Sequence, residues 1–198
     1  MQVFIFDVSN ISVEQAKQYL DVLSVTEKGR FDSMISLKRQ KEFVLGHVWL
    51  RRLLCDLFHA DMSQACVETM PTGALSLPYM PNTYASISHT EERLAIAIGD
   101  APLGLDIEYI SDQHNFPALL NQIDAVEKAK ELIASGMSVQ DAFYRLWCRR
   151  EALYKLNSQA QTDMPFIYDY KYENYMLCLA CQKAVAVDWI IKKGTDYV

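Results

Sequence analysis

The period of the hydrophobic pattern changes several times along the chain, and the order of these changes limits the folds open to it. Helical spacing predicts helices over about 12–23, 33–59, 119–134 and 138–156. Short apolar runs predict strands at 3–7, 83–88, 94–98, 103–108, 167–172, 176–181 and 184–191. The order strand, helices, strands, helices, strands is typical of an α+β fold and not of an alternating parallel sheet.

Bulk properties narrow the class of protein. No apolar run approaches the roughly 20 residues that span a bilayer, and the first residues lack the pattern of a signal peptide, so we expect no membrane partner and a cytoplasmic location. The odd number of cysteines, five, favours reduced thiols over a disulfide framework. A formal net charge of −6 gives no support to a nucleic-acid partner.

Positive charge is nevertheless concentrated in one segment, between Lys28 and Arg52. Seven basic residues stand there against the acidic Asp32 and Glu42. The basic residues are Lys28, Arg30, Lys38, Arg39, Lys41, Arg51 and Arg52. This segment can hold phosphates or an acidic partner, and a solvated helix face explains the charges equally well.

Two carboxylates, Asp106 and Glu108, are separated by one residue in the run GLDIE. On a strand, side chains at this spacing project from the same face. Like charges so close are costly unless a cation relieves them, and carboxylate oxygens are ligands that Mg²⁺ accepts. An edge strand with a solvated acidic face is the plainer alternative.

The predicted helix at 138–156 carries Trp147, Glu151 and Lys155 at steps of four, which places them along one stripe. A surface Glu–Lys helix pair explains two of the three residues. A third carboxylate near Asp106 and Glu108, with a lysine one turn on, would instead suit a metal and a pyrophosphate together.

The tripeptide Ser88-His89-Thr90 ends a predicted strand with two hydroxyls and an imidazole, groups that can contact an anion. A single histidine is more often a packed or surface residue. The G-x-S-x-G pattern of a hydrolase nucleophile is absent from the sequence, which argues against a Ser/His/Asp hydrolase.

Three motifs, read in order, resemble those of the 4′-phosphopantetheinyl transferase superfamily. They are KRQKEFVLGHVWLRRLL, then SISHT with LGLDIE, then WCRREALYK. The length is similar to that of the larger surfactin- and enterobactin-type enzymes. This resemblance implies a monomer of two pseudo-symmetric α+β lobes, each a small, mainly antiparallel sheet packed with a long helix, over residues 1–100 and 101–198. The sequence also contains a weak internal similarity compatible with such symmetry, between Trp49-Leu-Arg51-Arg52 and Trp147-Cys-Arg149-Arg150.

The resemblance also implies an activity of the holo-[acyl-carrier-protein] synthase type. Phosphopantetheine would pass from coenzyme A to a serine of an apo acyl or peptidyl carrier protein, with Mg²⁺ as cofactor and 3′,5′-ADP as the leaving group. By motif position, the magnesium ligands would be Asp106, Glu108 and Glu151. The coenzyme A contacts would be Lys28, Arg39, Lys41, Gly73, Ser88, His89 and Lys155. Glu151, directly or through a water, would accept the proton of the carrier serine, while Asp106 and Lys155 complete the catalytic group.

Three positions depart from the family pattern. Ala74 stands where a lysine is usual, His47 stands where an arginine follows Gly46, and Arg150 replaces the lysine before Glu151. These changes bear on affinity for coenzyme A more than on the reaction. A family member that binds coenzyme A or a carrier protein without transfer is the alternative. An unrelated metal-dependent phosphohydrolase would share the carboxylates but leaves SISHT and the basic segment unexplained.

Overall fold

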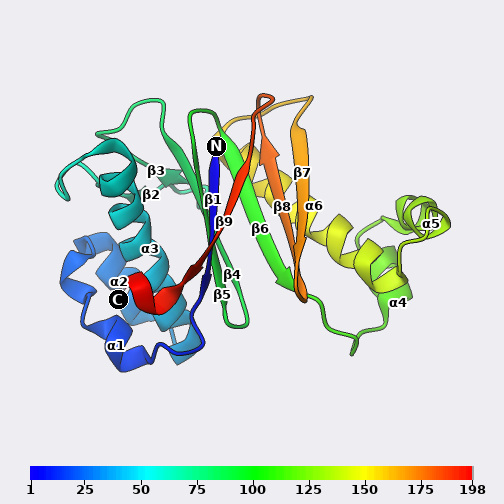
Figure 1. The fold of residues 1–198 in the computed structure, drawn as a ribbon, viewed down its shortest axis with the longest axis horizontal. Coiled ribbons are helices and arrows are strands. Elements are labelled where there is room, and N and C mark those ends of the chain that lie inside the picture. The colour runs from blue at the N-terminus through cyan, green and yellow to red at the C-terminus, as the bar shows by residue number, and fades with distance from the viewer. Residues whose placement is uncertain (198) are drawn as a thin grey trace.

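Two long helices, α3 (Leu37–Phe58) and α6 (Val139–Gln159), lie on opposite outer sides of the molecule, with all the longer strands between them (Figure 1). The structure is a computed structural model that describes residues 1–197. Each long helix packs on its own sheet, so the molecule consists of two lobes of similar build. The predicted α+β fold with two lobes is confirmed.

The N-terminal lobe contains a four-stranded sheet in the order β4-β5-β1-β9. Its strands are β1 (Gln2–Asp7), β4 (Tyr84–Thr90), β5 (Arg93–Gly99) and β9 (Asp188–Lys193). Antiparallel pairing joins β4 to β5 and β5 to β1, whereas β9 runs parallel to β1. The last strand of the chain therefore returns to the first lobe. The expected boundary near residue 100 stays a prediction, and residue 198 lies outside the described residues.

The C-terminal lobe contains a three-stranded antiparallel sheet in the order β6-β8-β7. Its strands are β6 (Leu103–Tyr109), β7 (Phe166–Tyr172) and β8 (Tyr175–Cys181). A separate short hairpin pairs β2 (Glu68–Thr69) with β3 (Leu75–Ser76) beside the first lobe. This hairpin carries Gly73, which has a φ of 87°, in its turn.

The shorter helices correct two expectations from the sequence. They are α1 (Val13–Lys17), η1 (Leu20–Val22), α2 (Val25–Ser33), α4 (Phe116–Gln122), α5 (Val126–Ala134) and η2 (Gly194–Tyr197). No helix was predicted between 24 and 32, whereas a capping box of Ser24 and Glu27 starts α2 there, and the helix predicted over 33–59 begins at Leu37. The single helix expected over 119–134 is broken at Asp124, whose φ of 54° is left-handed.

The core forms three layers because the strands alternate their side chains between two faces. In β1, Phe4 and Phe6 pack toward α3, whereas Val3 and Ile5 point to the other sheet. The two sheets thus pack against each other, and the outer face of the second sheet packs against α6. No helix among residues 1–197 combines the length and the apolar character that crossing a membrane requires.

Hydroxyl groups join the two lobes where β4 passes β6. From Ser86 onward, every second residue of β4 carries a side-chain hydroxyl that accepts a hydrogen bond from a backbone N–H of β6, at 3.1 to 3.4 Å. The pairs are Ser86 with Leu105, Ser88 with Ile107, and Thr90 with Tyr109. We call this row of three hydrogen bonds the hydroxyl seam. It fixes the motif SISHT beside the motif LGLDIE.

Candidate active site

A cavity of about 560 Å³ lies between the two lobes. Its walls come from α2, α3, β4, the β2–β3 hairpin and the last two turns of α6. Five basic side chains from four elements line it, namely Arg30, Arg39, His47, His89 and Lys155. A cavity of this size, lined by cationic groups, suits a phosphorylated ligand.

Gly73 and Ala74 line the same cavity on the hairpin side. The described residues that line it include neither Lys28 nor Lys41. The Lys28 ammonium lies 3.6 Å from Asp21, and the Lys41 ammonium donates to the carbonyl of Val8. The basic segment is therefore divided: Arg39 points into the cavity, and the two lysines point elsewhere.

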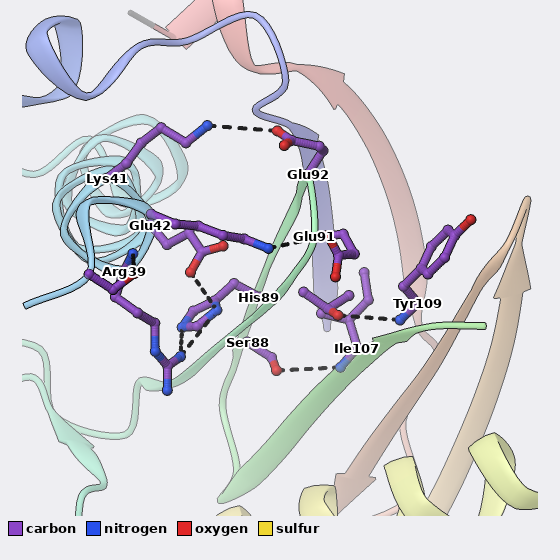
Figure 2. Close-up of polar contacts among 12 residues, drawn as sticks. Arg39, Lys41, Glu42, Ser88, His89, Glu91, Glu92, Ile107 and Tyr109 are labelled. Atoms are coloured by element: carbon purple, nitrogen blue, oxygen red, sulfur yellow. Dashed lines mark hydrogen bonds and ion pairs between the residues drawn. The ribbon is translucent and has the colours of Figure 1, made fainter. Parts of the chain in front are cut away.

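His89 projects from β4 toward α3, where Arg39 and Glu42 meet it (Figure 2). Its Nε2 lies 2.9 Å from Nη1 of Arg39, and its Nδ1 lies 3.1 Å from Oε2 of Glu42. Alternation along the strand explains this direction, since Ser88 and Thr90 face the seam and His89 faces the opposite way. Glu42, which the sequence shows only as one of two acidic residues in the basic segment, is thus part of the site.

Asp106 and Lys155 come together from β6 and α6. The Lys155 ammonium donates to Oδ1 of Asp106 at 2.8 Å, to Oγ of Ser88 at 2.9 Å and to the carbonyl of Leu105 at 2.9 Å. Ser88 in turn donates to Oδ1 of Asp106 at 2.9 Å. The three residues that the motifs single out therefore form one hydrogen-bonded cluster, in which Ser88 and Asp106 are buried and Lys155 lines the cavity.

Glu108 lies two residues beyond Asp106 on β6 and lines a second cavity of about 680 Å³. The indole N–H of Trp147 donates to Oε1 of Glu108 at 3.0 Å, and the hydroxyl of Thr90 donates to Oε2 at 3.4 Å. Burial raises the pKa of Glu108, and the negative charge of Asp106 raises it further. Glu108 thus faces the second cavity, whereas Lys155, the partner of Asp106, lines the first.

The two carboxylates fit a divalent cation. Oδ2 of Asp106 is buried and has no hydrogen-bond partner among the described residues, so one hard oxygen ligand is unused. Burial raises the pKa of Glu108 most and repulsion by Asp106 adds to it, and a cation between the two groups would relieve that repulsion. Within residues 1–197, however, no three His, Cys, Asp or Glu side chains are gathered closely enough to bind a metal ion.

Glu151 is half-buried on α6, one turn from Trp147 and one turn from Lys155. Trp147 contacts Glu108 and Lys155 contacts Asp106, so the helix stripe that carries Glu151 runs along both strand carboxylates. This agrees with the predicted stripe. A role of Glu151 as third metal ligand or base remains a prediction.

A buried ionic group under the cavity was not foreseen from the sequence. Glu27 of α2 is 2% exposed; it accepts from Nδ1 of His47 at 2.6 Å and from the Arg51 guanidinium at 2.7 Å. His47 also lines the cavity. The Ser24-x-x-Glu27 capping pattern was the available signal, because it predicts α2 and hence the position of Glu27.

The chain is similar to proteins of one family. Residues 102–169 match the model of the 4′-phosphopantetheinyl transferase superfamily. The chain is 26% identical to the 4′-phosphopantetheinyl transferase psf-1 of Bacillus pumilus over 148 residues, which is 74% of this chain and 61% of that protein.

Two further relatives carry the same description. One is the 4′-phosphopantetheinyl transferase Sfp of Bacillus subtilis, 26% identical over 69% of this chain and 66% of that protein. The other is the 4′-phosphopantetheinyl transferase AcpT of Salmonella typhimurium, 27% identical over 59% of this chain and 58% of that protein. The aligned part thus spans about three fifths to two thirds of these relatives. Together with the three motifs, these matches make the chain similar to 4′-phosphopantetheinyl transferases of the Sfp and AcpT type.

Proposed function

We propose that this protein transfers 4′-phosphopantetheine from coenzyme A to a serine of an apo acyl or peptidyl carrier protein, releasing 3′,5′-ADP. One observation supports this above all others. Lys155 lines the cation-lined cavity between the lobes and is paired with the buried Asp106, while Glu108, two residues further along β6, lines a second cavity. A nucleotide can lie in the first cavity with its diphosphate near the acidic pair.

Arg39 and His89 suit the 3′-phosphate of coenzyme A, because both side chains line the first cavity and the Arg39 guanidinium carries several N–H donors. Gly73, at the turn of the hairpin, would lie near the adenine. Lys28 and Lys41 could reach a phosphate only by leaving their present contacts with Asp21 and Val8.

Asp106, Glu108 and Glu151 would hold the Mg²⁺ ion. When bound, the ion supplies positive charge against the pyrophosphate oxygens. Lys155 uses all three of its N–H donors inside the protein, so its contact with the pyrophosphate requires the exchange of one of them. Ser88 must also exchange a hydrogen bond to contact a phosphate, because its hydroxyl already donates to Asp106 and accepts from Lys155 and from the backbone N–H of Ile107.

The transfer forms a bond between the serine oxygen and the β-phosphorus of coenzyme A and breaks the bond from that phosphorus to the oxygen that leaves with 3′,5′-ADP. The serine hydroxyl must give up its proton as it attacks. Glu151 would accept this proton directly or through a water. Lys155 would stabilise the negative charge that develops on the 5′-phosphate of the leaving 3′,5′-ADP.

A holo-[acyl-carrier-protein] synthase activity, a monomeric state and a cytoplasmic location belong to the same proposal. The odd number of cysteines is in keeping with a reducing compartment.

The intact mass of an apo carrier protein, incubated with this protein, coenzyme A and Mg²⁺, tests the proposal. We expect a gain of one phosphopantetheine group. Asp106→Ala and Glu151→Ala should each reduce the transfer rate by a factor of about 1000 or more, since both remove a charge that acts on the reacting groups. Circular dichroism spectra like that of the wild type would show that both variants are folded.

Unchanged transfer in both variants would contradict the assignment of the acidic residues. Tight binding of coenzyme A with no gain of mass on any carrier in a panel of apo carrier proteins would instead identify a protein that binds without transfer.

A further inference from the structure

Glu42 is a buried carboxylate with a single partner. It lies on the inner face of α3, is 2% exposed, and contacts Nδ1 of His89 through Oε2. Its other oxygen, Oε1, is buried and has no hydrogen-bond partner among the described residues. A carboxylate with so little solvation is costly unless it compensates a positive charge close by.

The contacts of His89 determine which ring nitrogen carries the proton. Arg39 has only N–H donors, and its Nη1 lies nearer to Nε2, at 2.9 Å, than to Nδ1, at 3.5 Å, so Nε2 is the acceptor and is unprotonated. The single ring proton is therefore on Nδ1, which lies 3.1 Å from Oε2 of Glu42 (Figure 2). In this state His89 is neutral, and the lone pair of its Nε2 accepts the hydrogen bond from Arg39.

We propose that Glu42 is a positioning residue that lets His89 bind a phosphate monoester as a cation, and so selects 3′-phosphorylated coenzyme A. This inference rests on the proposed function. A dianionic phosphate that binds Arg39 removes the guanidinium from Nε2, because an ionic hydrogen bond to phosphate is stronger than one to a neutral ring. Nε2 can then take up a proton and donate a hydrogen bond to the phosphate, while Nδ1 stays beside the carboxylate of Glu42.

Glu42 determines whether this protonation is favourable. The other charged groups of the cavity, Arg30 of α2, Arg39 of α3 and Lys155 of α6, are cations and oppose a charged imidazole. Glu91, in the turn after β4, is already paired with Lys38 at 3.3 Å. Glu42 therefore supplies the one carboxylate in direct contact with His89 among the described residues.

Proton uptake distinguishes this role from a structural one. Near pH 8 a phosphate monoester is dianionic and an imidazole is ordinarily neutral, so a proton taken up on binding must go to the protein. Isothermal titration calorimetry in buffers of different ionisation enthalpy measures this proton. We expect an uptake approaching one proton with coenzyme A and none with 3′-dephospho-coenzyme A, which lacks only the phosphate in question.

Glu42→Gln keeps the shape of the side chain and removes its charge. We expect this variant to bind coenzyme A about tenfold more weakly and to lose the proton uptake, with unchanged affinity for 3′-dephospho-coenzyme A. Glu91→Gln is the matched control, because it removes the same charge near the site without touching His89. It should behave as the wild type with both ligands.

His89→Gln provides a second route if Glu42→Gln folds poorly. It should show the same selective loss for coenzyme A, and adding Glu42→Gln to it should have no further effect on binding. Equal weakening for both ligands, or retained proton uptake in Glu42→Gln, would overturn the role of Glu42 while leaving the transferase proposal intact. If the wild type binds neither nucleotide, both proposals fail.

Discussion

Single side chains in this protein connect helices to the site through buried charges. Glu27 shows this most clearly, because its carboxylate accepts the backbone N–H of Ser24 in the capping box of α2 and also accepts hydrogen bonds from His47 and Arg51 of α3. Burial by itself would raise the pKa of Glu27, but the hydrogen bonds from His47, Arg51 and Ser24 outweigh it and lower the pKa to about 2. Local capping and tertiary packing thus depend on one residue.

The low pKa of Glu27 predicts how stability changes with pH. An ordinary glutamate titrates near 4.5, so the stabilisation by Glu27 is complete above that pH and is lost as the pH falls to about 2. The shift corresponds to roughly 3 kcal/mol. Glu27→Gln should remove this contribution, and the free energy of unfolding in urea, measured between pH 2 and 6, gives the difference.

The control for this measurement is Glu68→Gln, a substitution of an exposed glutamate in β2. The gap in unfolding free energy between wild type and Glu27→Gln should narrow as the pH falls, whereas Glu68→Gln should follow the wild type. A gap that does not change with pH would contradict a low pKa of Glu27.

At the scale of elements, glycine decides how closely a helix lies on a strand. A Cβ atom on Gly104 of β6 would lie 2.0 Å from the carbonyl oxygen of Ala152 and 2.5 Å from the backbone nitrogen of Leu156. The backbone of α6 therefore rests directly on β6 at this residue. This contact brings Lys155 within reach of Asp106, two residues along the strand.

Gly104→Ala should lower the free energy of unfolding by about 3 kcal/mol or more, because backbone atoms must move to admit the methyl group. It should also weaken transfer, since α6 and Lys155 must shift. Thermal and urea unfolding measure the first effect and the carrier mass assay measures the second.

Gly29→Ala is the matched control at the element scale. Gly29 lies inside α2, and a Cβ atom there would meet nothing within 4 Å. Alanine in an exposed helix position should stabilise the protein by up to about 1 kcal/mol. Equal effects of the two substitutions would contradict the close packing at Gly104.

For the whole molecule, the decisive feature is the core between the two sheets. Val3 and Ile5 of the first sheet pack with Leu105, Ile107 and Leu177 of the second, all of them almost fully buried. The hydroxyl seam adds direct hydrogen bonds between β4 and β6. Neither lobe can expose its inner sheet face without losing this shared core, so we expect the lobes to unfold together.

Leu105→Ala tests this cooperativity. The substitution should cost about 2–5 kcal/mol, as is usual for a fully buried leucine. Hydrogen exchange followed by mass spectrometry should show protection in α3 and in α6 reduced by the same free energy. A loss of protection in α6 alone would show that the lobes unfold independently.

The candidate site could be predicted in part because strands and helices repeat at fixed spacing. Asp106 and Glu108 share a strand face, and Trp147 and Lys155 share a helix stripe, since covalent geometry places side chains with these periods. The capping box at Ser12 likewise starts α1 where the pattern predicts it. Motif spacing could not show that Lys28 and Lys41 point away from the cavity, because that depends on partners from other elements.

The sequence by itself determined the α+β class, the faces that carry the acidic residues and the resemblance to the 4′-phosphopantetheinyl transferases. Only the tertiary structure decided that β9 joins the first sheet, that Ser88 serves the seam, and that Glu42 is buried against His89. The physical reason is that periodicity comes from the local backbone, whereas the pairing of distant segments depends on which apolar faces exclude water together. A buried charge acquires its role only from the partner that this packing brings to it.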